Sequence, residues 1–206
     1  MLSADAIVKL QDETTVAWHT HPQGLDDSSS IDHPWLAHVS RQHRANFDLW
    51  HIEDEARTPG ATDAQLADVK RRIDRTNQLR NDLAEELDRI LLDWLAPQRL
   101  PAENATLHSE TPGLIIDRLS ILALKIYHTR EEAERPDASP DHCERNRDRL
   151  AILTDQRTDL ARCLDLLWRE TLAGTRRFKL YRQLKMYNDP TLNPAIYRST
   201  QSESGR

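Results

Sequence analysis

The chain has 206 residues, of which 30% are charged and only 5% aromatic, with 5 glycines and 10 prolines. This composition is typical of long helices and argues against many short strands joined by glycine-rich turns. The net charge of −6 argues against a nucleic-acid binder, because nonspecific binding depends on Lys and Arg at the phosphates. We therefore expect an all-α antiparallel bundle of about four long helices with short N- and C-terminal helices. It should form a single domain over residues 1–198, followed by a disordered tail, 199–206.

The N-terminus and the two cysteines indicate a cytoplasmic protein. The first seven residues have neither the basic n-region nor the apolar h-region of a secretory signal. Cys143 and Cys163 are both on one predicted helix, roughly 30 Å apart along its axis, so they cannot form a disulfide within that helix. We expect reduced thiols, a cytoplasmic location and no membrane span.

In chain order, the first predicted helix covers residues 4–19 and leads into a polar loop from His21 to His33. The second runs from Pro34 to about Arg57. Its apolar row, at helical spacing, is Ala45, Leu49, Ile52 and Ala56. A second row beside it contains Val39, His43, Asn46, Trp50, Glu53 and Arg57. This mixed row is either a surface edge or the wall of a cleft.

The third predicted helix has the clearest pattern in the chain. It begins after Thr62, a suitable N-cap, and ends at residue 94 or 95. Its seam steps by three and four residues through Leu66, Val69, Ile73, Thr76, Arg80, Leu83, Leu87, Ile90 and Trp94. The middle of this seam is polar, since Arg80 occupies it and Asn77 and Asn81 lie beside it.

The central element is predicted over residues 112–135, apolar on nearly every side. Thr111 is a good N-cap and Pro112 a good first helical residue. A helix of this kind belongs in a protein interior, so its polar residues need partners. These residues are Asp117, Arg118 and Lys125.

The fourth long helix is predicted over residues 141–173, with Gly174 in the C′ position. Its seam also has an arginine at the midpoint, in the series Cys143, Asn146, Leu150, Leu153, Arg157, Leu160, Leu164, Leu167 and Thr171. Residues 176–187 carry five basic residues and no acid, and we expect a short helix across the bundle. This basic helix either packs through its own aromatic residues, which we favour, or binds an acidic protein partner, a lipid surface or nucleic acid.

Arg80 and Arg157 are each halfway along an otherwise apolar seam, which predicts two guanidinium groups near the midplane of one bundle. Arginine stays charged and is rarely buried without a partner. One interpretation is a structural network in which Asp54, Asp117 or Glu131 is the counter-ion. The other is an anion-binding pocket between the helices, a usual location for ligand sites in bundles.

Titratable groups on the central helix are candidates for proton transfer. Asp117 and His128 share one stripe of it, and His128 near its end either acts as an acid or base or simply meets solvent. The Glu-x-x-His pair of di-iron bundles is absent, and only Asp48-x-x-His51 comes near it. No Gly-rich phosphate loop occurs either. We therefore expect no metal and no cofactor.

Two segments, residues 46–54 and 70–82, resemble the signature motifs of a bacterial domain family of unknown function. The resemblance extends to residues 109–128 and 185–189. It implies a helical protein of about this length, and some members are encoded among genes for envelope sugars and glycosyl transfer. No activity can be carried over. The resemblance draws attention to Asn46, Trp50, Glu53, Asp54, Asp74, Asn77, Arg80 and Asn81.

The favoured hypothesis is a small cofactor-independent enzyme that acts on an anionic metabolite, such as a sugar phosphate, sugar nucleotide or carboxylate, in glycoconjugate biosynthesis. The expected substrate-binding residues are Asn46, Trp50, Asn77, Arg80, Asn81, Lys125 and Arg157. The expected proton-transfer residues are His43, Asp54, Asp117 and His128. The alternative is a noncatalytic helical partner of a glycosyltransferase-type enzyme.

Overall fold

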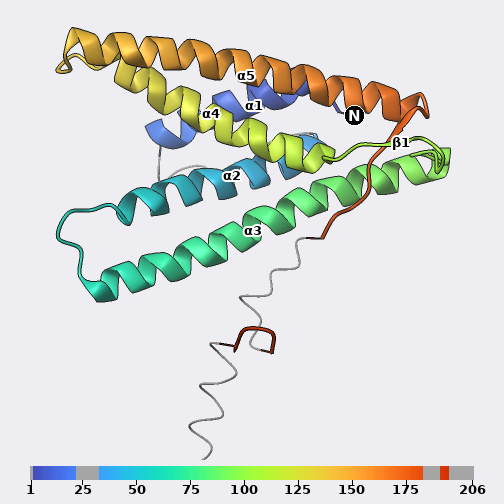
Figure 1. The fold of residues 1–206 in the computed structure, drawn as a ribbon, viewed down its shortest axis with the longest axis horizontal. Coiled ribbons are helices and arrows are strands. Elements are labelled where there is room, and N and C mark those ends of the chain that lie inside the picture. Colours follow the sequence, from blue (N-terminus) through green and yellow to red (C-terminus); the bar gives the residue numbers. More distant parts are fainter. Residues whose placement is uncertain (1, 22–32, 183–190, 195–206) are drawn as a thin grey trace, which may run out of the picture.

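Helix α4, Pro112–Glu134, lies at the centre of the fold and contacts the other four α-helices of the described chain (Figure 1). The computed structural model describes residues 2–21, 33–182 and 191–194. The surrounding helices are α1 (Ala4–Thr20), α2 (Pro34–Glu55), α3 (Asp63–Leu95) and α5 (Pro140–Leu172), and α3 continues into a short 3₁₀ turn, η2 (Ala96–Gln98). The prediction of an all-α bundle with four long helices and a shorter N-terminal one is confirmed.

Local signals set the helix boundaries close to their predicted positions. The Thr62 side chain accepts a hydrogen bond from the Gln65 N–H in a capping box at the start of α3. Thr111 caps α4 through the Leu114 N–H, and Pro112 follows it. Gly174, after α5, has φ +72°, a conformation that favours glycine. These caps explain why the ends of the helices could be predicted.

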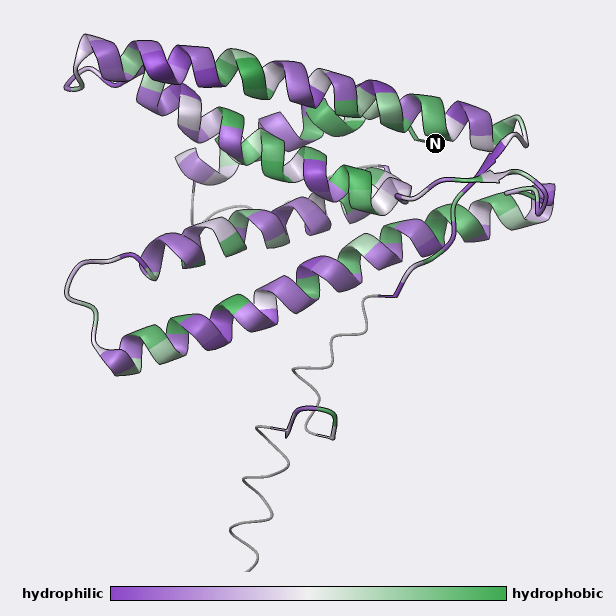
Figure 2. Ribbon diagram, in the orientation of Figure 1, coloured by the Kyte–Doolittle hydropathy of each residue, from purple (hydrophilic) through white to green (hydrophobic). Residues whose placement is uncertain are grey.

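The hydrophobic core lies between α4 and all four of its helical neighbours, α1, α2, α3 and α5. Its fully buried members include Ile7, Leu87, Leu91, Ile115, Ile116, Leu119 and Leu164. Figure 2 shows the apolar residues of α4 gathered toward its N-terminal half, with hydrophilic residues toward its C-terminal end. Within the described ranges, no helix combines the length and the apolar character that a bilayer span requires.

The predicted seam of α5 is confirmed, but that of α3 is wrong at both ends. Leu91 is fully buried whereas Trp94 is 41% exposed and Leu66 is 39% exposed. The reason is that α3 has different neighbours along its length. Its N-terminal half extends along α2 alone, while its C-terminal half also meets α4 (Figure 1).

The close approach of α3 and α4 depends on Gly113. A Cβ atom at this position would overlap the Ala84 carbonyl oxygen and lie 2.9 Å from the carboxyl carbon of Asp88. The Gly113 N–H donates to Asp88 Oδ1 at 2.6 Å, so a carboxyl group of α3 accepts from the N-terminus of α4. Burial raises the pKa of Asp88 to about 7, although its hydrogen bonds from Thr111 and Gly113 act in the opposite direction.

The segment after α5 differs from its prediction. Strand β2 (Arg176–Arg177) pairs in parallel with β1 (Thr106–Leu107), so residues 176–182 do not form the expected helix. The His108 N–H donates to the Arg177 carbonyl at 2.8 Å, and Phe178 is buried in the core. Pairing with the loop before α4 thus satisfies backbone groups that a helix would have satisfied internally. The rest of that predicted helix, 183–187, and the predicted tail, 199–206, lie outside the described residues.

Candidate functional site

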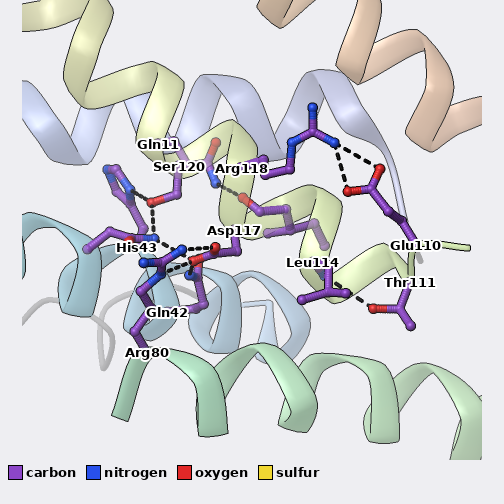
Figure 3. Close-up of polar contacts among 12 residues, drawn as sticks. Gln11, Gln42, His43, Arg80, Glu110, Thr111, Leu114, Asp117, Arg118 and Ser120 are labelled. Atoms are coloured by element: carbon purple, nitrogen blue, oxygen red, sulfur yellow. Dashed lines mark hydrogen bonds and ion pairs between the residues drawn. The ribbon is translucent and has the colours of Figure 1, made fainter. Parts of the chain in front are cut away.

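The centre of the candidate site is an ion pair between α3 and α4. Arg80 Nε donates to Asp117 Oδ1 at 2.8 Å, and its Nη2 donates to Oδ2 at 2.5 Å (Figure 3). This two-point geometry is the strongest arrangement between a guanidinium and a carboxylate. The bond to Asp117 raises the pKa of Arg80 further above its usual range. Arg80 is therefore fixed in orientation and permanently charged.

Two amides of α2 complete the shell around the Asp117 carboxylate. Gln42 Nε2 donates to Oδ1 at 2.6 Å and Asn46 Nδ2 donates to the same oxygen at 2.9 Å. All of these donors come from neighbouring helices, so the carboxylate joins α2, α3 and α4 at one point (Figure 3). The mixed row of α2 faces the protein interior here, and it is a cleft wall rather than a surface edge.

The network continues to His43, which is fully buried. Thr15 Oγ1 donates to the Gln11 carbonyl at 2.7 Å, so it accepts from His43 Nε2, 2.9 Å away. His43 Nδ1 is then the acceptor for Ser120 Oγ at 2.6 Å. Burial lowers the pKa of His43 to about 3, so this imidazole stays neutral near pH 7. It orients its neighbours and is not placed to exchange protons with a ligand.

A pocket of about 390 Å³ opens beside this network, between α2, α3 and α4. Its lining residues are Asn46, Leu49, Trp50, Glu53, Asp54, Arg57, Arg80, Ile121 and Leu124. Arg80 uses Nε and Nη2 for Asp117, and its Nη1 makes no hydrogen bond to any other described residue. The pocket is thus lined by the Arg80 guanidinium, which Asp117 holds in place, by the aromatic ring of Trp50 and by the carboxylates of Glu53 and Asp54.

The predicted site residues divide into four groups. The pocket lining contains Asn46, Trp50, Asp54 and Arg80, and the layer behind it contains His43 and Asp117. Asn77 and Asn81 lie on α3 next to Arg80, half-buried and buried respectively, but do not line the pocket. The others, Lys125, His128 and Arg157, do not line this pocket, although His128 stacks on its lining residue Trp50.

The expectation that Arg80 and Arg157 converge is wrong. Arg157 donates to Asp12 of α1 at 2.6 Å, whereas Arg80 binds Asp117. Their helices, α3 and α5, lie on opposite sides of α4 (Figure 1). The Trp94 and Trp168 rings bring them together near their C-terminal ends, away from both arginines, with centroids 5.7 Å apart. A seam pattern shows which face of a helix is interior but not which neighbour it meets.

Lys125 and His128 also lie elsewhere than expected. Lys125 is exposed and lines a separate groove between α4 and α5, with Gln156 and Asp159. The alternative in which His128 simply meets solvent is wrong as well. Its ring stacks on Trp50 with centroids 4.9 Å apart, and its Nε2 is buried.

His128 instead meets two histidines that the sequence pattern did not bring together. One ring nitrogen of each of His19, His51 and His128 lies within 4.8 Å of the others. They come from α1, α2 and α4, so no spacing within one helix could have revealed them. A weak signal existed, because each is one turn after a buried residue of its helix, namely Thr15, Phe47 and Leu124.

The fold and the site define an all-helical bundle whose interior polar network borders a pocket. A model of the family described as "Protein of unknown function (DUF4254)" matches residues 36–180, and the chain belongs to this family. No curated protein and no solved structure matches the chain. The matched region includes every residue that lines the pocket, whereas α1, with His19, precedes it.

Proposed function

We propose that this protein is a small enzyme that acts on an anionic, hydroxylated metabolite bound in the pocket between α2, α3 and α4. The substrate class is a sugar phosphate, sugar nucleotide or small carboxylate. The cytoplasm of a bacterium and a step of glycoconjugate biosynthesis form the proposed context. This context rests on the resemblance of the motifs at 46–54 and 70–82.

The observation that carries the proposal is the state of Arg80 at the pocket wall. Its side chain is 24% exposed, and the Asp117 carboxylate holds it from the side away from the pocket. A guanidinium fixed in this way needs little reorganisation when it binds an anion, because its orientation is already set. Arg57, at the rim of the same pocket, is a second cation for a phosphate or carboxylate.

The other lining groups suit a sugar. Asn46 gives both hydrogens of its amide nitrogen to Asp117 and Ser120, at 2.9 Å each, which leaves its Oδ1 to accept from a ligand hydroxyl. Trp50 supplies an aromatic surface for the apolar side of a sugar ring. Glu53 and Asp54 supply carboxylates that can accept or transfer a proton.

A thermal-shift screen with phosphorylated sugars, sugar nucleotides and small carboxylates tests the proposal. At 100 times its dissociation constant, a true ligand stabilises the protein by about 2.7 kcal/mol. The test variant combines Arg80→Met with Asp117→Asn, which removes both charges of the pair. The asparagine oxygen can still accept from Gln42 and Asn46, so we expect this variant to fold.

The matched control is Arg157→Met together with Asp12→Asn, which removes an ion pair that does not line the pocket. We expect a ligand to stabilise the wild type and the control but not the test variant. Equal stabilisation of both variants would place the ligand elsewhere. If no compound stabilises the wild type, the anion-binding enzyme is rejected in favour of the noncatalytic partner.

A further inference from the structure

Three histidine rings come together where α1, α2 and α4 meet, next to the pocket but outside its lining. The ring centroids of His19 and His51 are 5.1 Å apart, and those of His19 and His128 are 5.0 Å apart. Aromatic neighbours hold these rings in place. Tyr127 stacks on His19 with centroids 4.2 Å apart, and Trp50 stacks on His128.

Hydrogen bonds at Nδ1 fix the tautomers of two of the rings. His19 Nδ1 lies 2.7 Å from the Thr15 carbonyl oxygen, which can only accept, so this nitrogen carries the proton. His128 Nδ1 lies 2.9 Å from Glu131 Oε2, and the same argument applies to the carboxylate. In the neutral rings, Nε2 of His19 and of His128 therefore has a free lone pair.

The Nε2 atoms of all three histidines are buried and have no hydrogen-bond partner among the described residues. A buried polar atom without a partner is destabilising by about 1–3 kcal/mol, and such atoms are rare in native proteins. The free lone pairs of His19 and His128 also repel each other. A cation between the rings would satisfy all three at once.

We propose that His19, His51 and His128 form a binding site for a divalent transition metal ion, with Zn²⁺ as the best-suited ion. Neutral imidazole is a preferred ligand of zinc, copper, nickel and iron, and three histidines with an open fourth position are a known zinc arrangement. At a zinc to nitrogen distance of about 2.0–2.1 Å, tetrahedral ligand nitrogens lie roughly 3.3 Å apart. The rings, whose nitrogens already lie within 4.8 Å, need only a small rotation to reach this spacing.

The surroundings resemble the outer shell of a metal site. A histidine that binds a metal commonly donates its other N–H to a carboxylate or a carbonyl, as His128 does to Glu131 and His19 to Thr15. No fourth His, Cys or acidic ligand joins the three in the part of the chain that the structure describes. A water or a ligand group would hold the remaining position. This inference does not depend on the proposed substrate.

Metal titration of the purified full-length protein, after removal of metal by a chelator, tests the site. We expect calorimetry with Zn²⁺ to show about one ion bound per chain, and Co²⁺ to give the visible absorption of a tetrahedral centre. His51→Asn and His128→Asn should each abolish the cobalt spectrum. Glu131→Gln keeps every ligand and should weaken binding about 10–100-fold.

The control is His38→Gln, because His38 is also a half-buried histidine of α2, but it lies near Glu86 and outside the cluster. It should bind zinc as the wild type does. Circular dichroism of each variant shows whether it is folded before titration. The proposal is overturned if the folded wild type binds neither ion, or if His51→Asn and His128→Asn bind as tightly as His38→Gln.

Discussion

Two histidine-containing regions at the junction of α1, α2 and α4 differ in how completely the protein satisfies them. His43 is fully buried, and both of its ring nitrogens have hydrogen-bond partners, Thr15 and Ser120. His19 and His128 are only half-buried, yet each has a buried Nε2 without a partner in the described structure. Both ring nitrogens of the first region are thus satisfied within the protein, while the second region leaves buried ring nitrogens without a partner.

This difference suggests separate roles: the Asp117 and His43 network contributes to the stability of the fold, and the histidine cluster is available for binding. The network of Asp117 and His43 gives partners to the carboxylate and to both imidazole nitrogens and joins three helices, so its loss should strongly destabilise the protein. The histidine cluster, His19, His51 and His128, satisfies few of its polar groups and should contribute little to stability without a metal. Three measurements test the comparison.

The largest effect is expected from Asp117→Leu. This change removes the acceptor of Arg80, Gln42 and Asn46 and leaves a guanidinium uncompensated. Breaking a mostly buried ion pair in this way should lower the free energy of unfolding by about 3–5 kcal/mol, measured by urea denaturation. A loss below about 1 kcal/mol would show that the network is not a main source of stability.

A pH-dependent effect of intermediate size is expected at His43. Its pKa is about 3 in the folded protein and 6.5 as a free side chain, so the unfolded state binds more protons between these values. The stability of the wild type relative to His43→Gln should therefore fall as the pH decreases from 6.5, by up to about 1.4 kcal/mol per unit.

The comparison with His43→Gln is needed because Asp88 acts in the opposite direction. Its pKa is raised from 3.8 to about 7, so its contribution is complete below pH 3.8 and is lost as the pH rises through 7. Both proteins contain Asp88, and its effect cancels in the difference. If urea denaturation at pH 4.5, 5.5 and 6.5 gives a constant difference, His43 does not stay neutral in the fold.

The smallest effect is expected from His51→Leu in the presence of a chelator. The substitution removes a buried ring nitrogen that has no partner and keeps an apolar side chain beside Phe47. The free energy of unfolding should change by less than about 1 kcal/mol, in either direction. A loss above about 2 kcal/mol would mean that the His51 ring is itself a structural element, as His43 is.

The sequence allowed α1 to α5 to be predicted almost to the residue, because caps such as Thr62 and Thr111 and the heptad-like seams are local signals. The helix predicted after α5 is wrong. The sequence also identified Arg80 and Asp117 as polar groups on interior faces. It could not pair them, since the seam of α3 is equally compatible with a neighbour on α5. The histidine cluster and the pairing of β1 with β2 depend on how distant segments align along the bundle axis, and no local pattern carries that information.

The contact at Gly113 has a geometric consequence for the pocket. Gly113 meets the Ala84 carbonyl at the N-terminus of α4. From that end the ribbons of α3 and α4 diverge toward the C-terminus of α4 (Figure 1). The two helices thus diverge from a point of close approach at this glycine. A methyl group at residue 113 would change the angle between α3 and α4, and the resulting change in helix separation would grow with distance from this residue. The absence of a Cβ atom at residue 113, which does not line the pocket, therefore influences the width of the pocket.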